Sequence, residues 1–146
     1  MADLLNQIIL AGGTTAIEDV VSPDELRQWM ARSQGRSAWH VAARNGQIMG
    51  FQWIEPNPVL PPEAVDIASF VRMGATGLGI GRGLFIATQN AAKGLGYGWI
   101  NASIRSDNVS GLAYYSAMGF QDWKSDPTVT LSDGTVTGKT YKRFEL

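Results

Sequence analysis

The feature that most constrains this chain is a cluster of glycines in its second half. Seven of its 17 glycines lie between Gly74 and Gly96, and residues 74–84 read Gly-Ala-Thr-Gly-Leu-Gly-Ile-Gly-Arg-Gly-Leu. Glycine lets the backbone turn tightly and approach a ligand without a Cβ in the way. The segment falls between a predicted strand and a predicted helix, where first-turn amides lack internal partners and the helix dipole adds about half a positive charge. The sequence therefore predicts a diphosphate-binding loop.

The two commonest nucleotide-binding loops do not match this segment. A dinucleotide loop needs Gly-x-Gly-x-x-Gly, but Gly77-x-Gly79 is followed by Arg82, and Gly79-x-Gly81 by Leu84. A Walker loop needs Lys and then Ser or Thr after its last glycine, whereas Arg82 follows Gly81. On this loop alone, a glycine-rich turn without a ligand remains an alternative, as does a nucleotide-binding protein of another fold.

Composition excludes several other classes of protein. The chain has no cysteine and a single histidine, His40, so disulfides, thiolate nucleophiles and multi-histidine metal sites are excluded, and no metal is expected. Its net charge is −1 with Lys and Arg scattered, so no nucleic-acid partner is expected. No stretch approaches the roughly 18 apolar residues of a membrane span, and no signal peptide is recognisable. We therefore expect a cytoplasmic protein.

Periodicity and turn signals predict one domain, residues 1–146, of mixed α/β class. Ser22-Pro23-Asp24-Glu25 is typical of a helix start, and Asn45-Gly46 of a two-residue hairpin. The expected sheet is mixed and mostly antiparallel, with six or seven strands around a central strand-loop-helix unit. Helices are predicted over residues 3–10, 24–32, 79–94 and 108–119, and strands over residues 39–44, 47–54, 65–73, 99–104, 120–124 and 139–144.

A second motif follows the glycine loop after about 25 residues. It reads Asn108-Val-Ser-Gly-Leu-Ala-Tyr-Tyr-Ser-Ala-Met-Gly-Phe120. Together with Thr76–Gly81, it resembles the paired motifs of the GNAT acetyltransferase superfamily, Arg/Gln-x-x-Gly-x-Gly/Ala and Asn-x-x-Ala-x-x-x-Tyr-x-x-x-Gly-Phe. The resemblance covers roughly Ala38 to Phe120. It implies acetyl-CoA as co-substrate and an amine as acceptor.

Two departures from the family pattern stand out. Thr76 occupies the position where the family usually has Arg or Gln, which leaves the diphosphate to backbone amides and Arg82. The family also begins with a strand before its first helix, whereas this sequence opens on a predicted helix. Without that strand a sheet edge is exposed, and exposed edges pair with other chains, so a homodimer is an open alternative.

The resemblance also assigns roles to individual residues. The backbone of Val71–Met73 is expected to pair with the pantetheine arm, the loop amides to hold the diphosphate, and Asn108 to contact the pantetheine unless it only caps a helix. Tyr115 is expected near the thioester sulfur, although Tyr114 beside it is an alternative. The residues assigned to acetyl-CoA are Val71, Arg72, Met73, Thr76, Gly77, Leu78, Gly79, Ile80, Gly81, Arg82, Gly83, Asn108 and Tyr115.

Acetyl transfer to an amine by direct attack needs a base and an acid. A free alkyl amine titrates near ~10.4, so a group or a water must take its proton. Glu55 and Asp66, at or in predicted strands, are base candidates, as is His40 by pKa alone. Tyr115 is the general-acid candidate, since a tyrosine of pKa ~10 suits a thiolate whose acid lies near ~8.5. The alternative function is a non-catalytic acyl-CoA-binding or sensor protein on the same fold.

Overall fold

The computed structural model describes residues 1–146 and confirms the predicted order of elements. None of its four helices combines the length and the apolar character that a bilayer span requires. The helices are α1 (Ala2–Ala11), α2 (Pro23–Arg32), α3 (Ile80–Gly94) and α4 (Val109–Ala117). The strands are β1 (Ala38–Arg44), β2 (Gln47–Glu55), β3 (Ala64–Val71), β4 (Trp99–Arg105), β5 (Gln121–Thr130) and β6 (Val136–Glu145).

The six strands form one sheet in the order β1-β2-β3-β4-β6-β5. Only β3 and β4 are parallel, so the predicted mixed, mostly antiparallel sheet is confirmed. Among the described residues no strand precedes α1, and β1 is an edge strand with a neighbour on one side only.

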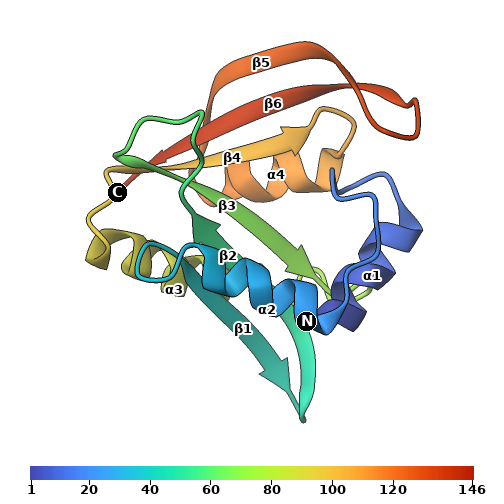
Figure 1. The fold of residues 1–146 in the computed structure, drawn as a ribbon, viewed down its shortest axis with the longest axis horizontal. Coiled ribbons are helices and arrows are strands. Elements are labelled where there is room, and N and C mark those ends of the chain that lie inside the picture. The colour runs from blue at the N-terminus through green and yellow to red at the C-terminus, as the bar shows by residue number, and fades with distance from the viewer.

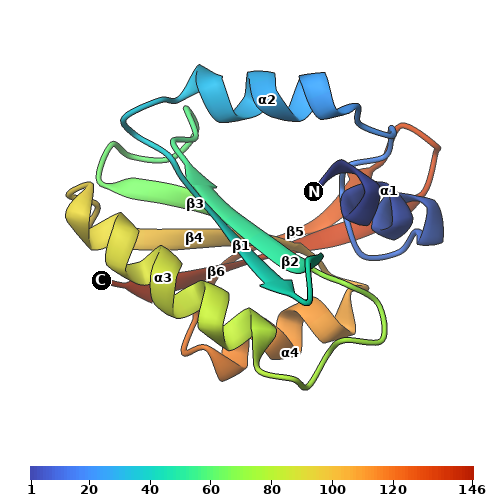
Figure 2. The ribbon, with the colours of Figure 1, turned by 90° about the horizontal axis from the view of Figure 1, so that it is seen from below.

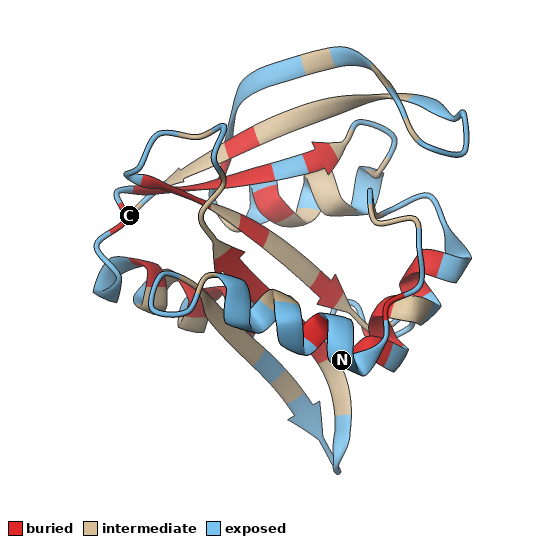
Figure 3. Ribbon diagram, in the orientation of Figure 1, coloured by how far each residue is buried: buried red, intermediate tan, exposed pale blue.

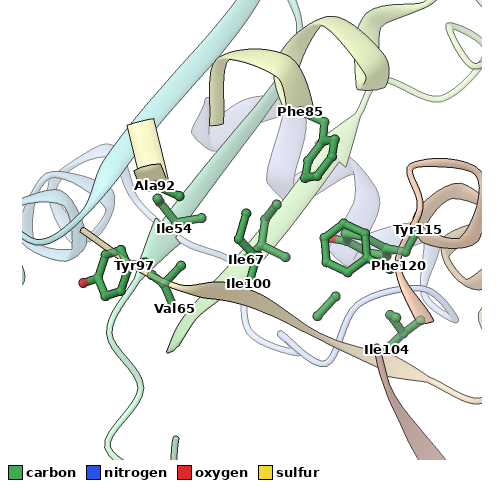
Figure 4. Close-up of a cluster of buried hydrophobic side chains, with 11 residues drawn as sticks. Ile54, Val65, Ile67, Phe85, Ala92, Tyr97, Ile100, Ile104, Tyr115 and Phe120 are labelled. Carbon is green, nitrogen blue, oxygen red and sulfur yellow. The ribbon is translucent and has the colours of Figure 1, made fainter. Parts of the chain in front are cut away.

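Helices cover both faces of the sheet, and each face has its own apolar cluster. Figure 2 shows α2 on one side and α3 and α4 on the other. The buried residues concentrate in the inner strands and on the inward sides of the helices, whereas β5 and the turn after it are mostly exposed and β6 is mostly intermediate (Figure 3). The cluster under α1 and α2 includes Leu5, Phe51, Trp53 and Phe70. The cluster under α3 and α4 includes Ile54, Ile67, Phe85, Ile100, Tyr115 and Phe120 (Figure 4).

Local sequence explains the start of α2 and the turn of the first hairpin. The Ser22 side chain accepts a hydrogen bond from the Glu25 amide, and the Glu25 carboxylate accepts one from the Ser22 amide, which is a complete capping box. Asn45 and Gly46 both have positive φ, 50° and 76°, as a tight hairpin turn requires. Both elements are therefore fixed by residues within a few positions of each other.

The late strands are longer than the sequence predicted. β5 extends to Thr130 and β6 begins at Val136, against predicted strands over residues 120–124 and 139–144. Two register shifts interrupt the β5–β6 pairing, between Asp122 and Lys124 and between Asp126 and Val129. Each shift breaks the alternation of side chains by which a strand is read from sequence, so the extensions were missed.

Gly50 of β2 lets α3 approach the sheet, and its replacement by alanine is expected to lower the free energy of unfolding by about 1–3 kcal/mol. A Cβ there would lie 2.9 Å from the Phe70 carbonyl oxygen, 3.0 Å from Ile80 Cγ2 and 3.2 Å from Leu84 Cδ1. Urea denaturation measures the change. The control is Gly94→Ala at the exposed end of α3, where a Cβ meets nothing within 4 Å. Equal stability of the two variants would contradict this packing argument.

Candidate functional site

Strands β3 and β4 pair over only part of their length. The parallel register runs from Ala64 opposite Trp99 to Ile67 opposite Ala102, although β3 continues to Val71 and β4 to Arg105. Figure 1 shows the two strands diverging toward their C-terminal ends. Residues Ala68–Val71 of β3 therefore pair with β2 on one side and with no strand on the other. We call this side the open edge of β3.

The register decides which backbone groups point to the open edge. The Arg72 amide donates to the Met49 carbonyl at 2.8 Å, so this residue faces β2. Because alternate residues of an antiparallel strand face opposite neighbours, the N–H and C=O groups of Ser69 and Val71 face the open edge. The Ser69 amide is the first beyond the last parallel pair. Within the segment Val71–Met73 that was predicted to pair with pantetheine, Val71 therefore has backbone N–H and C=O groups that face the open edge, and the Arg72 amide does not.

Arg72 uses both its side chain and its backbone amide in contacts within the protein. Its Nε and Nη2 atoms donate to the Ile48 carbonyl at 3.0 and 2.8 Å, and its Nη1 donates to Gln7 at 3.3 Å. Together with the backbone bond to Met49, these contacts tie the end of β3 to β2 and α1. Arg72 fixes the course of the open edge without presenting its own amide to it.

The glycine loop leaves a run of backbone amides without partners. Hydrogen bonding within α3 begins at the Gly83 amide, which donates to the Gly79 carbonyl at 3.0 Å, and the amides of residues 76–82 donate to no protein acceptor. Gly77 and Gly79 have left-handed φ values of 83° and 77°. A Cβ built at either of them or at Gly83 meets nothing within 4 Å, so the space beside these three glycines is open. These free amides at a dipole end form a site for an anionic group.

Tyr115 joins the open edge from α4. Its ring is buried beside Phe120 in the apolar cluster (Figure 4), and its hydroxyl lies 2.8 Å from the Ser69 hydroxyl. Burial raises the pKa of the Tyr115 phenol, so the hydroxyl carries its proton at neutral pH. The structure thus places Tyr115 next to the first free residue of β3.

Tyr114 has a different position from its neighbour. Its hydroxyl donates to the Gly81 carbonyl at 2.8 Å, in the first turn of α3. Its ring packs so closely on that turn that a Cβ at Gly81 would lie 2.7 Å from the ring. Burial raises the pKa of the Tyr114 phenol as well. Tyr114 therefore supports the loop, whereas Tyr115 reaches the open edge.

Asn108 caps α4. Its Oδ1 accepts from the Gly111 amide at 2.9 Å, and its Nδ2 donates to the Thr14 carbonyl at 2.9 Å. A Cβ at Gly111 would lie 2.5 Å from Asn108 Nδ2, which explains the glycine where the related motif has alanine. Asn108 thus anchors the α1–α2 loop next to the C-terminal end of β4.

The two carboxylate candidates lie opposite each other on β2 and β3, on the sheet face that carries Phe70. Glu55 is ion-paired with Arg32 at 2.7 Å and accepts from Trp53 Nε1 at 3.3 Å. Asp66 has no cation within 4 Å and accepts only from neutral amides. Burial raises the pKa of Asp66, and no cation neutralises this carboxylate, whereas Glu55 is held by Arg32.

Two asparagines that the sequence did not single out hold Asp66. Asn57, from the proline-rich loop after β2, donates to Asp66 Oδ2 at 2.8 Å. Asn101, buried on β4, donates to Asp66 Oδ1 at 2.7 Å and accepts from Trp123 Nε1 at 2.9 Å. Each asparagine is an ordinary polar residue in its own segment, and only the β3–β4 register reveals the pairing of Asn101 with Asp66.

His40 lies away from the open edge. It is on β1, two strands from β3, and its Nδ1 lies 3.1 Å from Thr88 Oγ1 of α3. Burial lowers the pKa of its imidazole. The structure does not bring His40 together with Tyr115 or Asp66.

The sequence profile and the curated relative that match this chain are both acetyltransferases. A sequence profile described as the acetyltransferase (GNAT) family matches residues 8–120. Among curated proteins, mycothiol acetyltransferase from Amycolatopsis mediterranei (strain U-32) is 28% identical over 120 residues, which are 78% of this chain and 38% of the relative. The chain thus spans well under half the length of this relative.

Solved structures share the fold. Ribosomal-protein-alanine N-acetyltransferase from Brucella melitensis superposes with a TM-score of 0.89 at 21% identity, over 99% of this chain and 91% of that one. A phosphinothricin acetyltransferase from Sinorhizobium meliloti, in complex with acetyl-CoA, gives 0.86 at 21% identity, over 99% and 80% of the two chains.

Proposed function

This chain belongs to the acetyltransferase (GNAT) family, and we propose that it transfers an acetyl group from acetyl-CoA to a primary amine by direct attack in a ternary complex. One observation carries the proposal. The open edge of β3 runs toward the free amides at the start of α3, with Tyr115 beside its first free residue. In this arrangement the backbone edge would pair with the pantetheine arm, the free amides would hold the diphosphate, and Tyr115 would stand beside the thioester sulfur.

Binding of acetyl-CoA would use backbone groups for most of its contacts. The amides of residues 76–82 would donate to the diphosphate, with Arg82 exposed at the same helix start. Ser69 and Val71 would pair with the amides of the pantetheine arm as a neighbouring strand does. Thr76 adds no positive charge, so we expect affinity to depend on the backbone amides and Arg82.

The chemistry divides between the two faces of the sheet. On one face Asp66 would take the proton of the attacking amine, directly or through a water, because its raised pKa makes it a stronger base than an exposed aspartate. The Ser69 or Val71 amide would donate to the developing oxyanion. On the other face Tyr115 would give its proton to the departing thiolate.

The acceptor is proposed only as a class. The names of the curated relative and of the two solved structures refer to three different molecules, mycothiol, ribosomal-protein alanine and phosphinothricin, so they support no single acceptor. The test is thiol release from acetyl-CoA across a panel of small-molecule and peptide amines. Amine-dependent release supports the proposal. Binding of acetyl-CoA without turnover on any amine would instead favour a non-catalytic acyl-CoA-binding protein.

The role of Asp66 predicts a specific pH dependence. If Asp66 is the base, kcat falls as the pH drops through its pKa, because the protonated carboxyl cannot accept a proton. The Asn57 hydrogen bond lowers the pKa of Asp66, so Asn57→Ala should raise that pKa and move the acid limb of the kcat profile to higher pH. Asn90→Ala, on the exposed side of α3, should leave the limb in place. An unmoved limb in Asn57→Ala would point to proton loss directly to water.

A further inference from the structure

A buried glutamine lies between the glycine loop and the open edge of β3. Gln52 of β2 is 0% exposed and sits opposite Ser69 in the β2–β3 register. Its Nε2 donates to Ser69 Oγ at 2.6 Å and to the Tyr114 hydroxyl at 3.1 Å. Its Oε1 is buried and has no hydrogen-bond partner. An unpaired buried carbonyl destabilises the folded state. Any favourable contribution of Gln52 therefore comes from the two hydrogen bonds that its Nε2 donates.

The hydrogen-bond chain fixes the orientation of the Gln52 amide. The Gly81 carbonyl can only accept, so Tyr114 must donate its single proton to it. The Tyr114 oxygen must then accept from Gln52, which places Nε2 rather than Oε1 toward Tyr114 and Ser69. The direction of donation therefore runs from Gln52 outward to both hydroxyls.

This direction continues to Tyr115. Ser69 Oγ accepts from Gln52, which leaves the Ser69 proton free to occupy the 2.8 Å contact with the Tyr115 hydroxyl. When Ser69 donates across this contact, the Tyr115 proton is not used in it and is available to another acceptor. The Tyr115 hydroxyl lies beside Ser69, the first residue of β3 beyond its pairing with β4, and the proposed function places the thioester sulfur at this edge.

We propose that Gln52 is a positioning residue for the acid step, holding Ser69 so that the Tyr115 phenol presents its proton to the leaving thiolate. In that step the O–H bond of Tyr115 breaks and an S–H bond forms on coenzyme A, while the acetyl carbon–sulfur bond breaks. The inference rests on the proposed function. Gln52 touches no reacting atom: it acts on the acid step through Ser69 and Tyr115, and its second hydrogen bond is to Tyr114 at the glycine loop.

A double-mutant cycle tests the proposal. Gln52→Met keeps the side-chain length and removes both donated bonds. It should lower kcat by about tenfold in the wild-type background and by less than about twofold in Tyr115→Phe, because interactions through a shared partner are not additive. The KM for acetyl-CoA should stay within about threefold, since Tyr114 loses its bond from Gln52 but keeps its own bond to the Gly81 carbonyl in the loop. Gln47→Met, an exposed position on the same strand, is the matched control and should leave kcat unchanged.

The outcomes separate the two claims. A similar loss of kcat in both backgrounds, or no loss in either, would overturn the role of Gln52 while leaving the proposed function intact. Absence of amine-dependent thiol release by the wild-type protein would remove the proposed function, and the role of Gln52 with it. Circular dichroism of each variant confirms that the compared proteins are folded.

Discussion

Replacing Tyr115 with phenylalanine is expected to lower kcat by about 100-fold or more, the usual contribution of a positioned general acid. The substitution removes one oxygen and keeps the ring that packs against Phe120. The leaving thiolate would then depart without a proton donor beside Ser69. The KM for acetyl-CoA should change little, because the phenol is proposed to act on the leaving group rather than on the bound diphosphate. Steady-state kinetics with a saturating amine measures both parameters.

Tyr97 provides the matched control for this substitution. It is as buried as Tyr115, at 8% against 7% exposed, and its hydroxyl makes one hydrogen bond, to the Arg36 carbonyl at 2.7 Å. Tyr97→Phe should lose a similar amount of stability, about 1 kcal/mol, with kcat unchanged. If the two variants lose kcat equally, the loss reflects weakened packing and Tyr115 is not the acid.

Replacing Gly79 with aspartate is expected to weaken acetyl-CoA binding by at least about 100-fold, since a like charge facing a bound anion costs several kcal/mol. Gly79 caps α3 with φ of 77°, amid the amides that have no partner. The new carboxylate would occupy the proposed diphosphate site and would itself accept from those amides. Isothermal titration with acetyl-CoA measures the change in affinity.

The strain of a left-handed aspartate has to be separated from its charge. Gly46 in the β1–β2 turn has φ of 76°, and a Cβ there meets nothing within 4 Å, as at Gly79. Gly46→Asp should therefore lose comparable stability and retain acetyl-CoA affinity. Equal loss of affinity in both variants would place the diphosphate away from α3.

Most of the fold was predictable because its signals are local. The capping box at Ser22, the hairpin turn at Asn45-Gly46 and the glycine loop before α3 each depend on residues close in sequence. The paired motifs around Gly79 and Tyr115 also lie in short segments, so a candidate site could be proposed from the sequence.

What escaped prediction depends on register between distant segments. Hydrogen bonds join three residues from separate elements, Gln52 of β2, Ser69 of β3 and Tyr115 of α4. The sequence of any one element does not show that these residues meet on one face of the sheet, where β3 and β4 diverge. The alternation of side chains over residues 65–73 predicts that Ile67, Ser69 and Val71 share one face, but only the pairing of β3 with β4 shows that Ser69 is the first residue beyond that pairing.

The buried face of α3 was also only partly predictable from the sequence. The apolar spacing favours Leu84, Thr88, Ala91 and Leu95, whereas the buried residues are Leu84, Phe85, Thr88 and Ala92. Leu95 follows the last helical residue and is exposed, because the helix ends at Gly94. The buried face is shifted by one position because of the way in which α3 crosses the sheet. The sequence of the helix alone does not determine how it crosses.

The central claim is that unpaired amides at the start of α3 and the open edge of β3 together hold acetyl-CoA. A crystal structure of the protein with coenzyme A tests it most directly. We predict diphosphate oxygens within about 3 Å of amides in residues 76–82, and pantetheine amides paired with the backbone of Ser69 and Val71. A diphosphate bound elsewhere on the molecule, or a pantetheine arm that leaves Ser69 and Val71 unpaired, would contradict the claim.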